Sequence, residues 1–180
     1  MKKDFFYALT CLCFTIMIGG AVYEHLTAVP QWAAAPPHSL SMFQGEYGLK
    51  PQAFWMLIHP VNIVLFAITL ALHWKTARKG TVLSIFGLYV SVLLITALYF
   101  VPELLRITTT PFSTTTDADL TKRASLWEML SLVRLGCLLV MAIVLFLGLA
   151  KPAARLSAGN RNALKSKNGR EEPAFAQTAP

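Results

Sequence analysis

The sequence has little charge and very little cysteine. Only 14% of its 180 residues are charged and 55% are apolar, whereas about a quarter of the residues are charged in an ordinary soluble domain. This composition excludes a soluble or a disordered protein. The three cysteines, Cys11, Cys13 and Cys137, all lie inside apolar segments and cannot form a paired extracellular framework. We interpret them as small apolar side chains.

Motifs for metals, phosphates and nucleophilic catalysis are also missing. No Cys and His cluster has zinc spacing, no glycine loop could cradle a phosphate, and no Ser, His and acid arrangement is present. The net charge of +7 does not indicate a nucleic-acid partner, because the basic residues cluster at the ends of apolar segments and in the tail. We expect neither a metal nor a nucleic acid.

The chain does contain four apolar segments that are long enough to cross a bilayer, at about 20 residues per crossing. They run from about residue 5 to 23, 54 to 73, 82 to 101 and 126 to 150. The predicted fold is an all-α integral membrane protein, a four-transmembrane-helix bundle in one domain, 1–150. The first segment also resembles a cleavable signal peptide, with Lys2-Lys3 before it and Gly19-Gly20 near its end, but it is long enough to remain a helix.

Lysine and arginine predict the orientation, because they are enriched in cytoplasmic loops. One side would hold eleven of them: Lys2, Lys3, Lys75, Arg78, Lys79, Lys151, Arg155, Arg161, Lys165, Lys167 and Arg170. The other side would hold four: Lys50, Arg106, Lys122 and Arg123. We therefore expect a multi-pass protein of the plasma (inner) membrane with both termini in the cytoplasm. Residues 151–180 lack a periodic apolar pattern and predict a disordered basic cytoplasmic tail.

The two outer loops, 24–53 and 102–125, are long. The first combines four prolines with aromatic residues, which favours an ordered cap over the bundle. In the second, the run Thr115-Thr116-Asp117-Ala118-Asp119 resembles a helix start. The fourth helix is therefore predicted to begin above the membrane.

Polar residues of the spans gather in the outer half, and the inner halves carry almost nothing polar. At about 1.5 Å per residue, His59 lies about 8 Å and Arg134 about 12 Å below the outer ends of their helices. Ionisable residues at such depth are expensive and usually face the bundle interior. These two residues are the catalytic candidates.

Two triplets share the spacing i, i+4, i+7, which places three residues on one helical face. They are Trp55, His59, Asn62 and Trp127, Ser131, Arg134. We interpret them as the sign of two repeated helical hairpins, related by a parallel repeat about the membrane normal, whose polar faces converge on one site.

Substrate-binding and ion-pairing roles follow from this placement. The substrate-binding candidates are Trp55, Asn62, Trp127, Ser131, Tyr23 and Tyr99. Glu24 and Glu103 are candidate ion-pair partners for Arg134. Structural alternatives remain open: the Trp and Tyr residues also suit an interfacial belt, Asn62 and Ser131 suit interhelical hydrogen bonds, and His59 suits a bond to the backbone freed by Pro60.

Three stretches resemble the anthrone-oxygenase-like family of four-helix membrane proteins. They are Gly19-Gly20-Ala21-Val22-Tyr23 with Val29-Pro30, Tyr99 to Pro102, and Trp127 to Arg134. The resemblance spans roughly residues 5–150 and implies the four-helix fold. Members studied as anthrone oxygenases convert polycyclic anthrones to anthraquinones with dioxygen and without a metal or flavin, whereas most bacterial members have no assigned reaction.

If that chemistry carries over, His59 removes an acidic C–H proton as general base and Arg134 stabilises the resulting enolate. Trp55, Trp127 and the tyrosines would hold the planar ring. The first functional hypothesis is thus an outward-facing polar pocket that binds, and in a stronger form oxidises, a lipid-soluble aromatic or quinone-like molecule.

Two other hypotheses stay open. One is a non-enzymatic membrane subunit or scaffold, acting as a homodimer or with a partner membrane subunit. The other is a haem-binding electron carrier with His25 and His59 as ligands. No cofactor is expected under the first two.

Overall fold

The computed structural model describes residues 2–151, which are helical and contain no strand. Four stretches are long and apolar enough to cross a membrane: α1 (Lys2–Thr27), α3 (Gln52–His73), the continuous stretch Lys79–Thr108 and α6 (Ala118–Leu149). The third stretch comprises α4 (Lys79–Ile95), η2 (Thr96–Phe100) and α5 (Val101–Thr108). The all-helical prediction with four candidate spans is confirmed. The predicted disordered tail, from residue 152 onward, lies outside the described residues.

The helices extend further at the loop ends than the sequence predicts. The third stretch reaches Thr108, and α6 begins at Ala118. The Asp117 side chain accepts hydrogen bonds from the backbone N–H groups of Asp119 and Leu120, at 2.8 and 3.0 Å. These bonds satisfy donors that a helix start leaves free, so the predicted helix start before the fourth apolar segment is confirmed.

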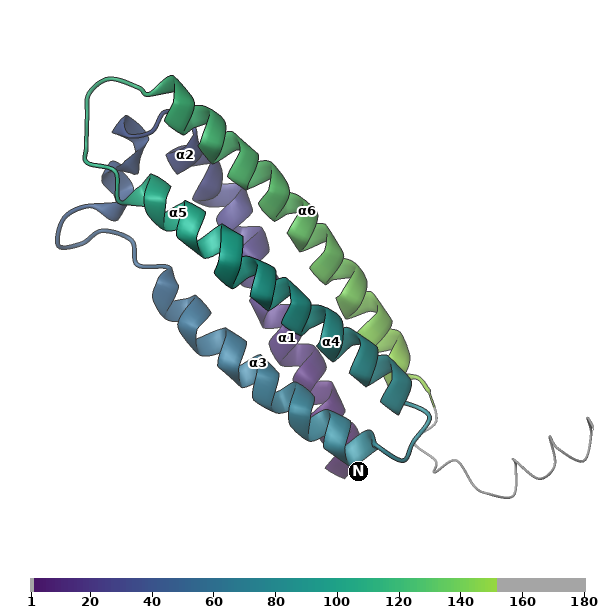
Figure 1. The fold of residues 1–180 in the computed structure, drawn as a ribbon. Helices are drawn as coiled ribbons and strands as arrows, with labels where there is room; N and C mark the ends of the chain where they lie inside the picture. The colour runs from purple at the N-terminus through teal and green to yellow at the C-terminus, as the bar shows by residue number, and fades with distance from the viewer. Residues whose placement is uncertain (1, 152–180) are drawn as a thin grey trace, which may run out of the picture.

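The four long helices form an antiparallel ring (Figure 1). Helix α1 packs against α3 and α6, and α4 packs against the same two helices. Phe14 of α1 lies at the centre, in edge-to-face contact with Phe66 of α3 and Tyr89 of α4 at centroid distances of 5.5 and 5.3 Å. This up-down-up-down order is compatible with two repeated hairpins, whose relation by a repeat stays a prediction.

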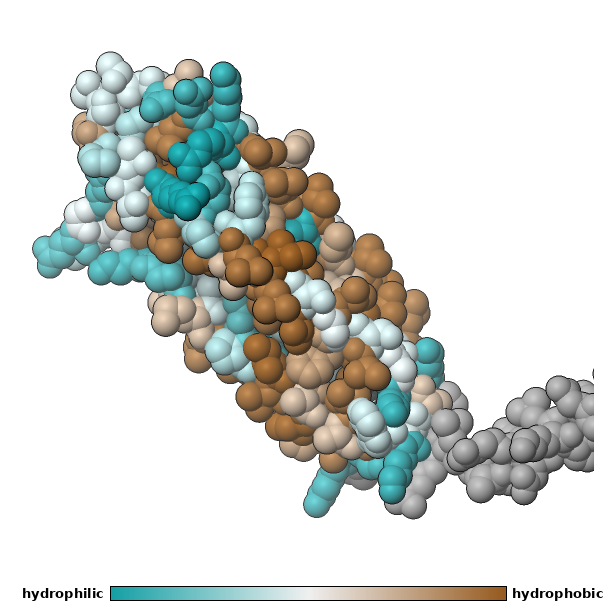
Figure 2. Space-filling view, viewed as in Figure 1, coloured by the Kyte–Doolittle hydropathy of each residue, from teal (hydrophilic) through white to brown (hydrophobic). Residues whose placement is uncertain are grey.

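Figure 2 shows a broad apolar belt with hydrophilic residues at both ends of the rod. Leu57, Leu98 and Leu147 are 68%, 79% and 63% exposed on this belt. Water would penalise so much exposed apolar surface, whereas the hydrocarbon of a bilayer would cover it. We call the end that carries Glu24 and Trp127 the loop end, and the end that carries Lys3 and Arg78 the basic end.

An ordered cap covers the loop end, as the proline-rich first loop predicts. It consists of α2 (Val29–Ala33) and η1 (His38–Phe43). Trp32 of the cap is buried against Trp127 of α6, at a centroid distance of 5.5 Å. The cap is therefore anchored to α6 at the start of the predicted span.

The turn η2 is a π-helix, in which the N–H of Val101 donates to the carbonyl of Thr96. Pro102 follows at once and has no N–H to donate, so the regular hydrogen-bond ladder cannot continue through it. Such wide turns are common at functional sites. Thr96 and Phe100 lie in this turn, and both contact Arg134 of α6.

The basic end contains a buried polar network, which corrects the expectation that the inner halves carry almost nothing polar. Arg78 donates to Asp4 Oδ1 and to the carbonyls of Leu149 and Lys151, each at 2.7 Å. Tyr7 donates to the Leu145 carbonyl at 2.8 Å. This network was not predicted, because Tyr7 lies inside an apolar run and Arg78 lies in a short turn whose charged residues are all basic.

Candidate functional site

A layer of polar side chains crosses the bundle below the cap, and all four long helices contribute to it. We call it the polar layer. Its members are Glu24 of α1, Trp55, His59 and Asn62 of α3, Tyr89 and Thr96 of the third stretch, and Ser131 and Arg134 of α6.

His59 lies in a chain of contacts that joins three helices. Glu24 Oε1 accepts from Trp55 Nε1 at 2.9 Å, and the Trp55 ring stacks on His59 with 5.5 Å between centroids. His59 Nδ1 is 2.8 Å from the Tyr89 hydroxyl, which donates to Met17 Sδ at 3.4 Å. Either Nδ1 or the Tyr89 hydroxyl can be the donor of the bond between them, according to the tautomer of the imidazole. In both tautomers the neutral ring keeps one nitrogen lone pair.

His59 therefore bonds across the bundle rather than to the backbone that Pro60 frees. The nearby proline remains inside α3. The alternative prediction, a hydrogen bond from His59 to the nearby backbone, is wrong for Nδ1, because this atom is hydrogen-bonded to the Tyr89 hydroxyl.

Arg134 is held by neutral groups. Its NH1 donates to Thr96 Oγ1 at 3.1 Å and its NH2 donates to Ser131 Oγ at 2.8 Å. The guanidinium carbon lies 4.2 Å from the centroid of the Phe100 ring, a cation–π contact. Glu24 and His59 are within electrostatic range of Arg134. Within residues 2–151, however, no carboxylate oxygen lies within 4 Å of it.

Neither candidate partner, Glu24 or Glu103, forms an ion pair with Arg134 within 4 Å, and both carboxylates accept hydrogen bonds from other residues. Glu24 accepts from Trp55, as described above. Glu103 accepts from Arg123 at 2.7 Å and lies 3.8 Å from Arg106. The physical reason is that α6 begins eight residues earlier than the predicted 126 and so carries Arg123 alongside α5.

Asn62 is fully buried and only partly satisfied. Its Nδ2 donates to the Ile58 carbonyl at 3.0 Å, within its own helix. Its Oδ1 has no hydrogen-bond partner in the described part of the chain. A buried acceptor without a donor costs about 1–3 kcal/mol, so Asn62 is an unused acceptor inside the bundle.

Three other predicted binding residues do not join the polar layer. The Tyr23 side chain is 67% exposed and that of Tyr99 is 37% exposed. The indole of Trp127 is buried in the cap and donates to the Phe100 carbonyl at 2.9 Å. Exposure of the tyrosines agrees with a place in the interfacial belt, and the contacts of Trp127 are those of a packing residue.

The haem alternative concerns His25 and His59. His25 Nδ1 is 2.8 Å from the Ala21 carbonyl, and its Nε2 is buried without a partner within residues 2–151. The same part of the chain contains no group of three or more His, Cys, Asp or Glu side chains that could hold a metal ion. The haem reading stays a prediction.

Sequence reasoning missed Met17, Tyr89 and Thr96. A tyrosine in the middle of an apolar run, such as Tyr89, is the one available signal, because its hydroxyl needs a partner when buried. The role of Thr96 depends on the π-helical turn and leaves no pattern in the sequence. No family model, no curated protein and no solved structure matches this chain. The anthrone-oxygenase-like resemblance therefore remains an expectation.

Proposed function

We propose that this chain is a multi-pass protein of the plasma (inner) membrane, with cytoplasmic termini, whose polar layer binds a lipid-soluble aromatic or quinone-like molecule from the outer side. The observation that carries the proposal is Arg134. Its guanidinium has two hydroxyl partners and one aromatic ring, and no carboxylate oxygen within 4 Å among residues 2–151. An electron-rich oxygen of a bound ligand would stabilise this guanidinium charge by a charge-assisted hydrogen bond.

Two further features match the chemistry of such a molecule. The stacked pair of Trp55 and His59 offers a flat aromatic surface next to the polar groups. The unused Oδ1 of Asn62 would accept from a phenolic hydroxyl. A planar ring with a carbonyl or phenolate oxygen on one edge and a hydroxyl on another satisfies Arg134 and Asn62 together.

Binding of 2-methyl-1,4-naphthoquinone to the full chain in lipid nanodiscs tests the proposal. Tryptophan quenching gives the dissociation constant. We expect Arg134→Gln to weaken binding at least about tenfold, since the lost contact is a charge-assisted hydrogen bond. The matched control is Arg106→Gln, because the Arg106 side chain is 73% exposed and lies outside the polar layer. Equal affinity in wild type and Arg134→Gln would contradict the proposal.

Oxidation is a second candidate function, favoured by the fixed position of the His59 ring. The bond between Nδ1 and Tyr89 and the stacking on Trp55 orient the ring, and the tautomer protonated on Nδ1 has its lone pair on Nε2, as a general base requires. An anthrone would lose a C–H proton to Nε2, and its carbanion would react with dioxygen. The balance is one anthrone and one dioxygen to one anthraquinone and one water.

Oxygen uptake with 1,8-dihydroxyanthrone measures this activity. We expect His59→Ala to abolish turnover while the helical content, followed by circular dichroism, is preserved. Full activity in that variant would remove His59 from the mechanism.

The rival functions predict different behaviour of the purified protein. A non-enzymatic subunit or scaffold predicts that a partner membrane protein, or a second copy, copurifies with the chain and that no quinone binds. A haem-binding electron carrier predicts a visible Soret band that His25→Ala or His59→Ala removes.

A further inference from the structure

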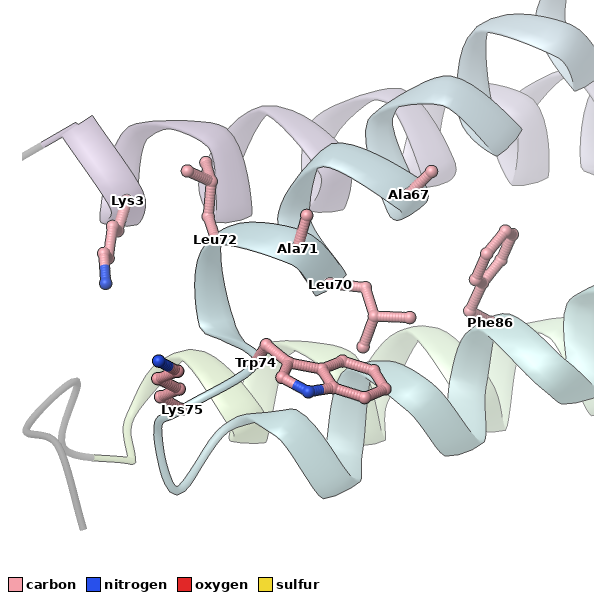
Figure 3. A pocket seen from close by; sticks show the side chains of 8 residues that line it. All are labelled: Lys3, Ala67, Leu70, Ala71, Leu72, Trp74, Lys75 and Phe86. Carbon is pink, nitrogen blue, oxygen red and sulfur yellow. The ribbon is translucent and has the colours of Figure 1, made fainter.

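A cavity of about 630 Å³ lies at the basic end, beside α3 and α4 (Figure 3). Ala67, Leu70 and Ala71 of α3 line it together with Phe86 of α4. The two alanines are exposed and leave room beside the helix. The Phe86 ring is held in place by stacking on Phe66, with 5.5 Å between centroids. We call this cavity the α3–α4 groove; its size falls in the range of about 300–1,000 Å³ that is typical of ligand sites.

Positive charge surrounds one end of the groove. Lys3 of α1 and Lys75 after α3 line it, and Figure 3 shows both amino groups at the same end. Neither lysine forms an ion pair within residues 2–151. Asp4, the acidic neighbour, is bonded to Arg78 at 2.7 Å. The two lysines are therefore available to an anionic group.

Trp74 lies at the same end and marks the level of a membrane interface. Its side chain is 50% exposed and lines the groove. The ammonium of Lys79 lies 3.6 Å from the centroid of its ring. Tryptophan and lysine side chains are enriched where hydrocarbon meets the headgroup region.

We propose that the α3–α4 groove is a binding site for an anionic phospholipid. An acyl chain lies along Ala67, Ala71 and Phe86, and the phosphodiester lies between the amino groups of Lys3 and Lys75. Apolar lining and paired positive charge are what such a lipid requires, and basic pockets between transmembrane helices are known to suit anionic headgroups. The site is at the opposite end of the bundle from the polar layer and does not rest on the function proposed there.

The positive charge of Lys3 and Lys75 favours an anionic phospholipid over two alternative occupants of the groove, the C-terminal segment of the chain and a zwitterionic phospholipid. The tail segment 152–180 carries five Lys and Arg against two Glu, so its net charge has the same sign as Lys3 and Lys75. A zwitterionic phospholipid fills the apolar part equally well but brings no net negative charge. An anionic phospholipid satisfies both parts of the groove.

Native mass spectrometry of the full chain tests the proposal. The protein is incubated in detergent with equal amounts of dioleoylphosphatidylglycerol and dioleoylphosphatidylcholine, and the lipid retained is measured. We expect preferential retention of phosphatidylglycerol. The double variant Lys3→Gln/Lys75→Gln should lower it about fivefold per lysine, about 25-fold in all. The matched control is Lys50→Gln/Lys122→Gln, which removes the same charge near the loop end.

A second variant tests the apolar half with the charges intact. Ala71→Phe places a large side chain on an exposed position of α3, where it fills the groove without disturbing the core. It should lower phosphatidylglycerol retention as well. Equal retention of the two lipids by wild type, unchanged retention in either variant, or an equal loss in the control would overturn the proposal. So would displacement of the lipid by millimolar inorganic phosphate, because the site would then recognise the phosphate alone.

Discussion

Each end of the bundle holds an arginine among its helices, and the two arginines have different partners. At the basic end, Arg78 is 6% exposed and donates to one carboxylate and two backbone carbonyls. At the loop end, Arg134 donates to two neutral hydroxyls and lies on the Phe100 ring. Arg78 is buried and Arg134 is half-buried, and within residues 2–151 only Arg78 forms an ion pair with an acidic side chain.

This difference separates a structural role from a binding role. Arg78 ties the start of α1, the turn between α3 and α4, and the end of α6 into one network, so its value lies in the folded state. Arg134 joins only η2 and its own helix, and its charge is left for another group. Loss of the Arg78 side chain should therefore lower the stability of the fold. Loss of the Arg134 side chain should weaken ligand binding without lowering that stability.

The largest expected change in stability comes from a substitution at the basic end. Arg78→Met should lower the free energy of unfolding by about 3 kcal/mol, because it removes three hydrogen bonds that a buried, charged guanidinium donates. Unfolding of the purified chain in mixed micelles, with SDS as denaturant, measures the change. A loss no larger than that of the exposed-site control Arg106→Gln would show that the network contributes little.

The matching change at the loop end should have the opposite sign. Arg134→Met should raise the free energy of unfolding by about 1 kcal/mol, because it replaces a half-buried charge that has no carboxylate oxygen within 4 Å among residues 2–151 by an apolar side chain. Thr96 keeps its own bond to the Val92 carbonyl, at 2.8 Å. The same SDS titration measures it. If the variant is destabilised as strongly as Arg78→Met, Arg134 is a structural residue and the comparison fails.

A smaller effect is expected from Tyr7→Phe, which removes one hydroxyl from the basic end. The lost bond to the Leu145 carbonyl should lower the free energy of unfolding by about 1 kcal/mol. The ring stays packed below Arg78, whose guanidinium carbon lies 5.5 Å from the ring centroid. The thermal unfolding midpoint in detergent is the measurement, and no shift would mean that the hydroxyl is dispensable.

The smallest effect on stability is expected at the loop end from Trp55→Phe. The variant keeps an aromatic ring beside His59 and loses only the bond from Nε1 to Glu24. We expect a loss of about 0.5 kcal/mol in the free energy of unfolding. The affinity for naphthoquinone should change by less than about threefold, and it is measured by calorimetry because the variant lacks a tryptophan fluorophore. A complete loss of binding would show that the hydrogen bond between Trp55 and Glu24 is required for the binding site.

Much of the fold could be predicted from the sequence, because hydropathy and helix signals are local. The four apolar runs predicted the long helices, and Asp117 predicted the start of α6. The helix end at Thr108 was not predicted, because Ile107 and Leu104 pack against the cap beyond the apolar run.

Less of the site could be predicted, because it depends on which helix faces which. The spacing of Trp55 and His59 indicated a shared face, and their rings do stack. The sequence could not show that Glu24 bonds Trp55 while Glu103 bonds Arg123, since both choices depend on helix rotation and height. Trp127 shares the spacing of Trp55 but is buried under the cap.

The length of α6 has a consequence for sidedness. Its 32 residues span about 48 Å at 1.5 Å per residue, against about 30 Å of hydrocarbon. In a bilayer, the surplus of about 18 Å, with the cap attached, would project into one aqueous compartment. A thiol introduced at exposed Thr114, between α5 and α6, would stand on this projection; Cys11 and Cys13 are buried, and exposed Cys137 is replaced by alanine for the experiment. A membrane-impermeant maleimide would then label sealed vesicles from a single side and so report in which compartment the cap stands.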